Sequence, residues 1–345
     1  MKVSCRTWMK RPSAPAVVNV QHVSGAGFTK AANKVFDKRN AVIRICWKNY
    51  HTPHSVDEAV ELLKHYEGRA RVIGGGTDLL LEIQQGQSPV VEAMVDTSRI
   101  DGLNRIYKEH DRIVIGCAVT HTRIIHEESI IRFGTCLVES CGVIGGPQVR
   151  NVATLAGNVA HAMPAGDGSI GLLALGGEVE VTDAGGQHWL PLQHVFLGPG
   201  KSAIDPHLAL LTRLRFRPTA ANEGSAFSRI MRPQGVALPM FSMAARLQLN
   251  DNNTITAVRI SLGPAGPVPY LAEPAMDLLK GGSAVPQKFD QAVDAILDSV
   301  PLRTSKHRAT REYRAEMIRT HLPIILARAA ERARSGQAVP QGVGL

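Results

Sequence analysis

The chain has 345 residues, of which 44% are hydrophobic and 20% are charged, and its formal net charge is +9. These proportions are ordinary for a globular protein, and the length allows two or three domains with a proper core. No apolar run is long enough to span a bilayer, and residues 1–12 lack the apolar segment of a signal peptide. The five cysteines, an odd number without a visible signal, predict reduced thiols and a cytoplasmic location.

Strands and helices mix along the whole chain after an irregular beginning. Residues 1–42 show no clear period and predict a poorly ordered extension. Apolar or alternating runs predict strands at residues 43–45, 69–73, 90–95, 112–115, 178–182, 208–216, 241–249 and 255–262. Helical spacing predicts helices after Ser55 and at residues 120–128, 136–144, 272–280, 289–299 and 313–334. This mixture predicts an α+β fold.

Helix ends are marked by particular residues. Ser55 is followed three residues later by Glu58, which is the spacing of a capping box. Thr120 is a predicted N-cap for the helix at 120–128. Gly145-Gly146-Pro147 predicts the end of the helix at 136–144.

A polar stretch of small residues between Pro218 and Ser225 predicts a domain boundary. We therefore expect a first domain at residues 43–218, in two parts at about 43–100 and 101–218, and a C-terminal domain at 222–334.

The strand at 69–73 leads into Gly74-Gly75-Gly76-Thr77-Asp78, after which an apolar helix begins at Leu79. Glycine allows positive φ and lets a ligand approach the backbone, and successive N–H groups in such a turn bind anions. The loop departs from the Rossmann fingerprint, because the third glycine of that motif would stand at position 79. Thr77 is expected to cap the helix or bind a phosphate, and Asp78 to accept from backbone N–H groups or a ribose hydroxyl. Taken alone, the triple glycine also fits a tight turn between a strand and a helix.

A second glycine-rich loop spans Thr154 to Asp167. Two such loops in one domain predict a large anionic ligand, such as a dinucleotide, close to both backbones. His161 fits either a local hydrogen-bonding role or a cofactor contact. Asp167 fits either the N-cap of the helix that begins near Gly168 or a contact with the polar edge of the cofactor.

The segment Gly198-Pro199-Gly200-Lys201-Ser202 is similar to the end of a Walker A loop. The glycine required five residues before Gly200 is Val195, and Pro199 removes an N–H donor. The segment therefore predicts a surface turn rather than a nucleoside-triphosphate site.

Cys136 and Cys141 have the first spacing of a plant-type iron–sulfur site, but the next ligand position is Ile144. We interpret both cysteines as small core residues and predict no metal in this chain.

Basic residues are frequent after residue 302: Arg303, Lys306, His307, Arg308, Arg311, Arg314 and Arg319. They predict a solvated helix face or a docking surface for an acidic partner. Binding to nucleic acid is a further alternative, although no basic motif interleaved with aromatic residues is present.

Five segments in order resemble the flavin-binding subunit of the molybdenum hydroxylases, the xanthine dehydrogenase and carbon monoxide dehydrogenase group. They read NYHTPHSVDEAVELL, VIGGGTDLL, GGPQVRNVATLAGNVAHAMPAGD, AVRISLGPAGPVP and RATREYR. The resemblance extends over about residues 43–334. It implies a two-part PCMH-type FAD-binding domain followed by a smaller α/β C-terminal domain with antiparallel strands and helices.

The resemblance also implies which residues contact FAD. The first loop would wrap the pyrophosphate and ribityl chain through its backbone, the second loop would form the opposite wall, and Arg229 would supply the cation that the family often directs at the flavin. The expected FAD-binding residues are Val72, Ile73, Gly74, Gly75, Gly76, Thr77, Asp78, Leu79, Ile144, Gly145, Thr154, Gly157, Asn158, His161, Asp167, Leu210, Leu211 and Arg229. No residue of this chain is expected to be catalytic, because the chemistry belongs to the flavin.

As implied by the resemblance, the chain is an oxidoreductase component that works beside a molybdopterin-binding large subunit and an iron–sulfur small subunit. Electrons from the iron–sulfur clusters would pass through FAD to NAD or another acceptor. Two alternatives stay open from the sequence: a stand-alone FAD reductase of the UDP-sugar reductase type, and a basic nucleic-acid-binding protein.

Overall fold

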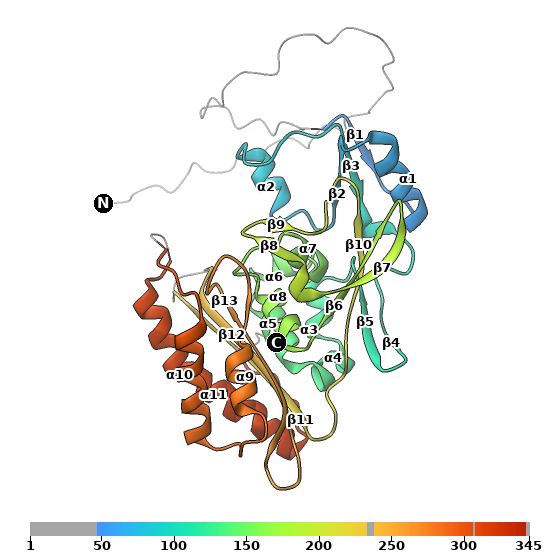
Figure 1. The fold of residues 1–345 in the computed structure, drawn as a ribbon. Coiled ribbons are helices and arrows are strands. Elements are labelled where there is room, and N and C mark those ends of the chain that lie inside the picture. The colour runs from blue at the N-terminus through green and yellow to red at the C-terminus, as the bar shows by residue number, and fades with distance from the viewer. Residues whose placement is uncertain (1–46, 233–237, 306–307, 343–345) are drawn as a thin grey trace, which may run out of the picture. The chain divides into compact units, whose positions relative to one another are not determined.

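A computed structural model of the chain describes residues 47–232, 238–305 and 308–342 (Figure 1). The predicted extension at 1–42 and the predicted strand at 43–45 lie outside the described residues. The domain limits given above stay predictions.

The first part of the described chain is built on a three-stranded parallel sheet with the strand order β1-β3-β2. Its strands are β1 (Asn49–His51), β2 (Ala70–Ile73) and β3 (Ala93–Asp96), and the helix α1 (Val56–Tyr66) packs against β2 and β3. The predicted cap of α1 is confirmed, because the Ser55 hydroxyl accepts from the Glu58 N–H at 3.1 Å. A short helix, α2 (Leu79–Gln84), follows β2 after the first glycine loop.

The second part is a five-stranded antiparallel sheet with the order β4-β5-β10-β6-β7. Its strands are β4 (Ile106–Glu109), β5 (Arg112–Gly116), β6 (Glu178–Asp183), β7 (Gly186–Pro191) and β10 (Leu210–Phe216). Between β5 and β6 run the helices α3 (His121–Ile125), α4 (Glu128–Phe133), α5 (Thr135–Gly142), α6 (Pro147–Arg150), α7 (Leu155–Ala160) and α8 (Asp167–Ala174). A two-stranded hairpin, β8 (Phe196–Gly198) and β9 (Lys201–Ser202), precedes β10.

The third part is a four-stranded antiparallel sheet in the order β11-β12-β13-β14, followed by three helices. Its elements are β11 (Glu223–Met231), β12 (Pro239–Leu249), β13 (Ile255–Gly263), β14 (Tyr270–Leu271), α9 (Glu273–Leu279), α10 (Pro286–Ser299) and α11 (Arg311–Ser335). Figure 1 shows these strands between the helices of their own part and the helices α5 and α8.

Strand β12 is buried on both faces, and its residues alternate between two cores. Met243, Ala245 and Leu247 pack in the cluster that includes α10 and α11. Ser242 and Arg246 point the other way, because their side chains bond to Asp167 and to the Leu175 carbonyl of the preceding part. The C-terminal sheet is therefore packed tightly against the helices of the second part.

A buried ion pair reinforces this packing. Glu139 on α5 is 1% exposed and lies 2.6 Å from the Arg332 guanidinium on α11. The same carboxylate accepts from the backbone N–H groups of Phe227 and Gln341 at 2.8 Å each. Helices that are far apart in sequence are thus joined at one fully bonded carboxylate.

Several details differ from the sequence predictions. The helix expected at 120–128 is split into α3 and α4, although Thr120 does cap α3 at 3.3 Å from the Arg123 nitrogen. Lys306 and His307 lie outside the described residues. The other basic residues after 302 do not form one solvated face, because Arg314 is completely buried and donates to the Pro264 carbonyl. Arg319, in contrast, is exposed and lies 3.7 Å from Glu316.

Candidate functional site

The first glycine loop presents a row of backbone donors. Strand β2 ends at Ile73, and α2 begins at Leu79 with Asp78 as its N-cap residue. Among the described residues, the backbone N–H groups of Gly75, Gly76, Thr77 and Asp78 have no hydrogen-bond partner. Consecutive unpaired N–H groups in a partly accessible turn form a nest for an anion. The expectation that Thr77 caps the helix was wrong, since the cap position falls on Asp78, whose side chain makes no cap bond.

The two glycine loops meet directly. A Cβ on Gly75 would lie 2.0 Å from the Val152 carbonyl oxygen, at the entrance of the second loop. A Cβ on Gly74 would lie 3.5 Å from the Thr154 hydroxyl oxygen, which is ordinary contact. The glycine at 75 is therefore needed for the close approach of the two backbones.

The strand before the loop is anchored from both sides. The Val72 N–H donates to the Pro206 carbonyl at 2.8 Å, and the Ile73 carbonyl accepts from the Thr97 hydroxyl at 3.3 Å. These bonds fix the position from which the glycine loop leaves the sheet.

Side chains inside the second loop shape the loop itself. The Thr154 hydroxyl caps α7 by accepting from the Gly157 N–H at 3.0 Å. The Asn158 side-chain oxygen accepts from the Ser169 N–H, also at 3.0 Å, and joins α7 to α8. Both residues hold the loop backbone in place.

His161 connects the second loop to the first. Its Nε2 atom lies 2.7 Å from the Glu82 carboxylate on α2, and its Nδ1 atom lies 4.0 Å from the Asp78 carboxylate. A cavity of about 380 Å³ opens beside this contact. It is lined by Arg71, Glu82, Ala160, His161, Met163, Gly200, Lys201, Ser202, Ile204, Asp205 and Pro206.

Asp167 lies at the start of α8 but does not cap it. The N-cap residue is Gly166, and the Asp167 carboxylate instead bonds to Arg229 at 3.1 Å and to the Ser242 hydroxyl at 2.6 Å. Burial raises the pKa of Asp167 to about 6, while Arg229 and Ser242 act in the opposite direction. The cap interpretation was wrong because the carboxylate is turned toward the C-terminal sheet.

The remaining predicted residues lie around these loops in different ways. The carbonyls of Ile144 and Gly145 accept from the Arg150 guanidinium at 3.1 and 2.9 Å. Leu210 and Leu211 lie on β10 and are buried in the main core, where β10 packs against α7. The structure thus gathers the first loop, the second loop and His161 in one place, and leaves the two leucines behind α7.

Part of the lining of this cavity was not predicted from the sequence. The turn at 198–202 is exposed at its tip, as the surface-turn prediction requires, but Gly200, Lys201 and Ser202 also line the cavity, and the Gly200 N–H donates to the Ala162 carbonyl at 3.1 Å. Arg71 also faces it and donates to Ser88 at 2.6 Å. One sign of this role was visible in the sequence: Arg71 is a charged residue within the otherwise apolar strand β2.

Within the described ranges, no group of three or more His, Cys, Asp or Glu side chains could hold a metal ion. Cys136 and Cys141 are buried on α5, where burial raises the pKa of the Cys136 thiol to about 12. Their surroundings are those of core residues.

Two protein families match the sequence. Residues 43–217 match the family described as the FAD binding domain in molybdopterin dehydrogenase, and residues 225–329 match the carbon monoxide dehydrogenase flavoprotein C-terminal domain. Together they cover most of the described chain. The protein belongs to the FAD-binding subunits of the xanthine dehydrogenase and carbon monoxide dehydrogenase family, and is an oxidoreductase component that takes FAD as its cofactor.

Individual relatives are similar to this chain over nearly their whole length. The xanthine dehydrogenase FAD-binding subunit of Escherichia coli is 26% identical over 83% of this chain and 97% of its own. The carbon monoxide dehydrogenase medium chain of Afipia carboxidovorans is 29% identical over 83% of this chain and 96% of its own. A solved chain of carbon monoxide dehydrogenase from Hydrogenophaga pseudoflava is 25% identical, with a TM-score of 0.77 over 82% of this chain and 97% of its own.

The expected fold and cofactor are confirmed by these matches. Neither a UDP-sugar reductase nor a nucleic-acid-binding protein is favoured by them. In the part of the chain that the structure describes, no helix has the length and apolar character to cross a membrane.

Proposed function

We propose that the chain is the electron-transfer subunit of a molybdopterin-containing hydroxylase complex, in which electrons from iron–sulfur clusters pass through FAD to NAD or another acceptor. The observation that carries this proposal is the meeting of the two glycine loops at Gly75 and Val152. The free N–H groups of residues 75–78 beside this contact fit a pyrophosphate. Bound FAD would supply the two-electron chemistry, which no side chain of this chain provides.

Different residues would hold different parts of FAD. The backbone of Val72 to Leu79 would bind the negatively charged part, and Thr154, Gly157 and Asn158 would keep the second wall in position. His161 would close the gap between both walls through Glu82.

The remaining predicted contacts lie at two other places. Asp167 and Arg229, fixed by each other and by Ser242, would face the polar edge of the ring system. Ile144 and Gly145 would lie near the adenine or the ring, and Leu210 and Leu211 would support the cofactor from the core behind α7.

The proposed partners are a molybdopterin-binding large subunit and an iron–sulfur small subunit. The relatives are named as medium chains or FAD-binding subunits, which are components of larger enzymes. The substrate would be oxidised on the large subunit, outside this chain.

The test begins with the cofactor. The purified full chain, denatured to release its flavin, is expected to yield one FAD per chain, identified by chromatography and mass. A chain that yields none and fails to bind added FAD would contradict the proposal. Binding of FMN with equal affinity would also contradict it, because the loops would then not be reading a diphosphate.

The acceptor needs a separate measurement on the native complex. Anaerobic NADH is expected to bleach the flavin absorbance, since hydride transfer between NAD and flavin is reversible. Bleaching by dithionite but not by NADH would remove NAD as the acceptor and leave the FAD assignment intact. Metal analysis of the same complex should find molybdenum and iron, and a chain that purifies alone in every preparation would contradict the proposed partners.

A further inference from the structure

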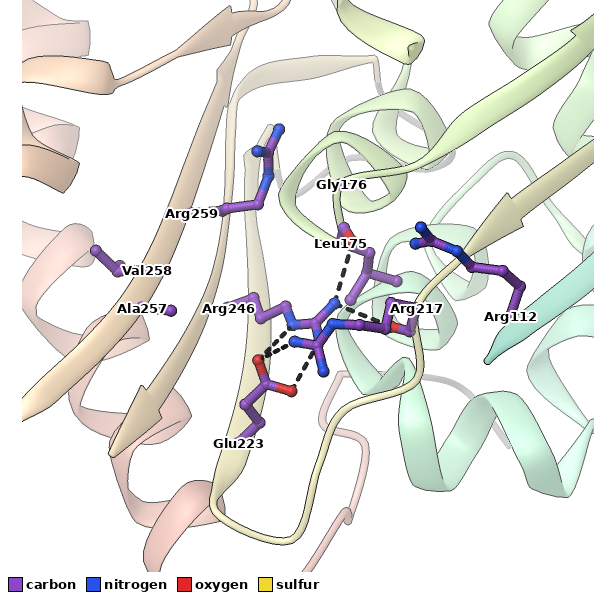
Figure 2. A pocket seen from close by; sticks show the side chains of 9 residues that line it. All are labelled: Arg112, Leu175, Gly176, Arg217, Glu223, Arg246, Ala257, Val258 and Arg259. Carbon is purple, nitrogen blue, oxygen red and sulfur yellow. Dashed lines mark hydrogen bonds and ion pairs between the residues drawn. The ribbon is translucent and has the colours of Figure 1, made fainter. Parts of the chain in front are cut away.

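A second cavity, of about 200 Å³, lies between the five-stranded sheet part and the C-terminal sheet (Figure 2). It is lined by Arg112, Leu175, Gly176, Arg217, Glu223, Arg246, Ala257, Val258 and Arg259. It shares no lining residue with the cavity beside His161. Four guanidinium groups therefore surround one carboxylate in a place that the FAD assignment does not use.

The single carboxylate is already fully engaged. Arg246 binds Glu223 with two nitrogens, at 3.2 and 2.7 Å, and Arg217 binds it at 2.5 Å. The other donors of Arg246 bond to backbone carbonyls, among them Leu175 at 3.1 Å. Arg246 and Glu223 thus form a closed, buried pair, and Glu223 has no capacity left to neutralise a third arginine.

Arg259 forms no ion pair with a carboxylate of the described residues. Among the described residues its only hydrogen bond runs from Nε to the Leu173 carbonyl at 3.4 Å, so both Nη groups are unused. Burial lowers the pKa of Arg259, the nearby charge of Arg246 lowers it further, and the carboxylate of Glu273 acts in the opposite direction. A half-buried guanidinium with unused donors and a like-charged neighbour is a strong site for an anion.

Arg112 completes the arrangement from the opposite side. Its nearest carboxylate is its own neighbour Asp111, at 3.6 Å, and the Asp111 side chain is 72% exposed. Figure 2 shows Arg112 and Arg259 on either side of the turn at Gly176. Gly176 has positive φ, and a Cβ there would lie 3.4 Å from the Arg259 Nε atom, so the absent side chain keeps this space open.

We propose that this pocket binds a tetrahedral phosphate-type dianion, either inorganic phosphate or the terminal phosphate of a nucleotide. Two or more surplus positive charges favour a dianion over a monovalent carboxylate, and planar guanidinium groups bind phosphate with paired N–H donors. Because Arg112 and Arg259 belong to different parts of the chain, the bound anion would join those parts and stabilise the subunit.

The test measures thermal unfolding of the purified full chain against increasing inorganic phosphate, with sodium chloride at matched ionic strength as reference. The unfolding midpoint temperature of the wild-type chain is expected to rise with phosphate concentration and then to level off. It is not expected to rise in chloride. Isothermal titration calorimetry with phosphate should give a dissociation constant that is at least tenfold larger for Arg259→Ala and for Arg112→Ala than for the wild type. The Arg112 side chain is 32% exposed and its only ion pair among the described residues is with Asp111, so its variant keeps the test valid if Arg259→Ala fails to fold.

The matched control is Arg105→Ala, which removes one exposed arginine whose side chain makes no hydrogen bond or ion pair with the described residues, and which keeps the backbone bond from the Gly116 N–H to the residue 105 carbonyl. It should bind phosphate like the wild type. A repeat with ADP on the FAD-loaded chain, whose glycine loops are already occupied, distinguishes the two sources, because binding that is tighter than phosphate and weakened by Arg259→Ala indicates a nucleotide, and equal binding indicates the free ion. A wild-type response equal to that in chloride, or equal phosphate binding by wild type and both pocket variants, would overturn the proposal.

Discussion

Gly75 lies so close to Val152 that a Cβ on residue 75 would be 2.0 Å from the Val152 carbonyl oxygen. The first glycine loop is therefore packed, backbone against backbone, on the entrance of the second. This contact alone requires glycine at position 75, whether or not a cofactor is bound. It also places the free N–H groups of the first loop at the border between the two loops.

Replacing Gly75 with alanine should push the loops apart. The overlap involves backbone atoms that cannot rotate away, so a loss of about 1–3 kcal/mol in unfolding free energy is expected. FAD retention should fall more steeply than stability, because the donors of residues 75–78 would no longer face the second loop. Urea unfolding and the FAD content of the purified variant measure both effects.

Gly74→Ala is the matched control for that change. Its Cβ would meet the Thr154 hydroxyl at 3.5 Å, an ordinary contact, and the loop geometry should survive. If Gly74→Ala and Gly75→Ala lost FAD and stability to the same degree, the loop contact would not be the cause.

The hydrogen bond between His161 and Glu82 should couple the two loops energetically. Each side chain is partly buried, with 27% and 29% exposed, and the atoms are 2.7 Å apart. A double-mutant cycle with His161→Ala and Glu82→Ala is expected to give a coupling of about 1 kcal/mol in unfolding free energy. The exposed pair Glu61 and Lys64 is the reference and should give less than about 0.5 kcal/mol. Equal coupling in both pairs would mean that the bond does not hold the loops together.

Asp167 should make stability depend on pH in an unusual direction. Burial raises its pKa to about 6 from 3.8, so the native state keeps this proton in a range where the unfolded chain has released it. The contribution of Asp167 to the free energy of unfolding therefore falls as the pH rises from about 4 to about 6, and then stays level. Two pKa units correspond to roughly 3 kcal/mol over that interval.

The measurement is the difference in unfolding free energy between the wild type and Asp167→Asn at a series of pH values. The variant keeps the shape but cannot titrate, so the other groups cancel. The unfolding free energy of the wild type should fall relative to that of the variant as the pH rises to about 6. A difference that is constant with pH, or that grows in favour of the wild type, would contradict this assignment.

Arg332→Ala should be strongly destabilising. It would leave Glu139, which is 1% exposed, without its cation, and such a loss costs about 3–5 kcal/mol. Arg319→Ala on the same helix removes only an exposed pair with Glu316 and should change stability by less than about 0.5 kcal/mol. Thermal or urea unfolding of the two variants compares them directly, and similar midpoints would show that α11 is not held by this pair.

Local patterns were sufficient for much of the fold. Ser55 and Thr120 were predicted as helix caps and accept the expected bonds, because capping depends on residues only three positions apart. The strand at 178–182 followed from its alternation, and the strands at 241–249 and 255–262 followed from the hairpin pattern that they form around a polar turn. Strand β11 was missed because it is buried on both faces over most of its length, which removes the alternating pattern.

The site was harder to predict because its contacts are long-range. The glycine loops were recognised by composition, but nothing near Gly75 in sequence points to Val152. Asp167 was interpreted as a possible cap because its partners, Arg229 and Ser242, are more than sixty residues away. The turn at 198–202 carries no local signal for lining a cavity, and only the tertiary fold brings it to His161.

Amide hydrogen exchange with and without FAD tests the central claim most directly. Peptides that cover residues 72–80 and 154–167 should both exchange more slowly once FAD is bound, because the unpaired N–H groups of the first loop then have an acceptor and the enclosed second loop opens less often. Peptides from α10, far along the chain, serve as the reference and should not respond. If FAD binds and neither loop gains protection, the two loops do not enclose the cofactor and the account is contradicted.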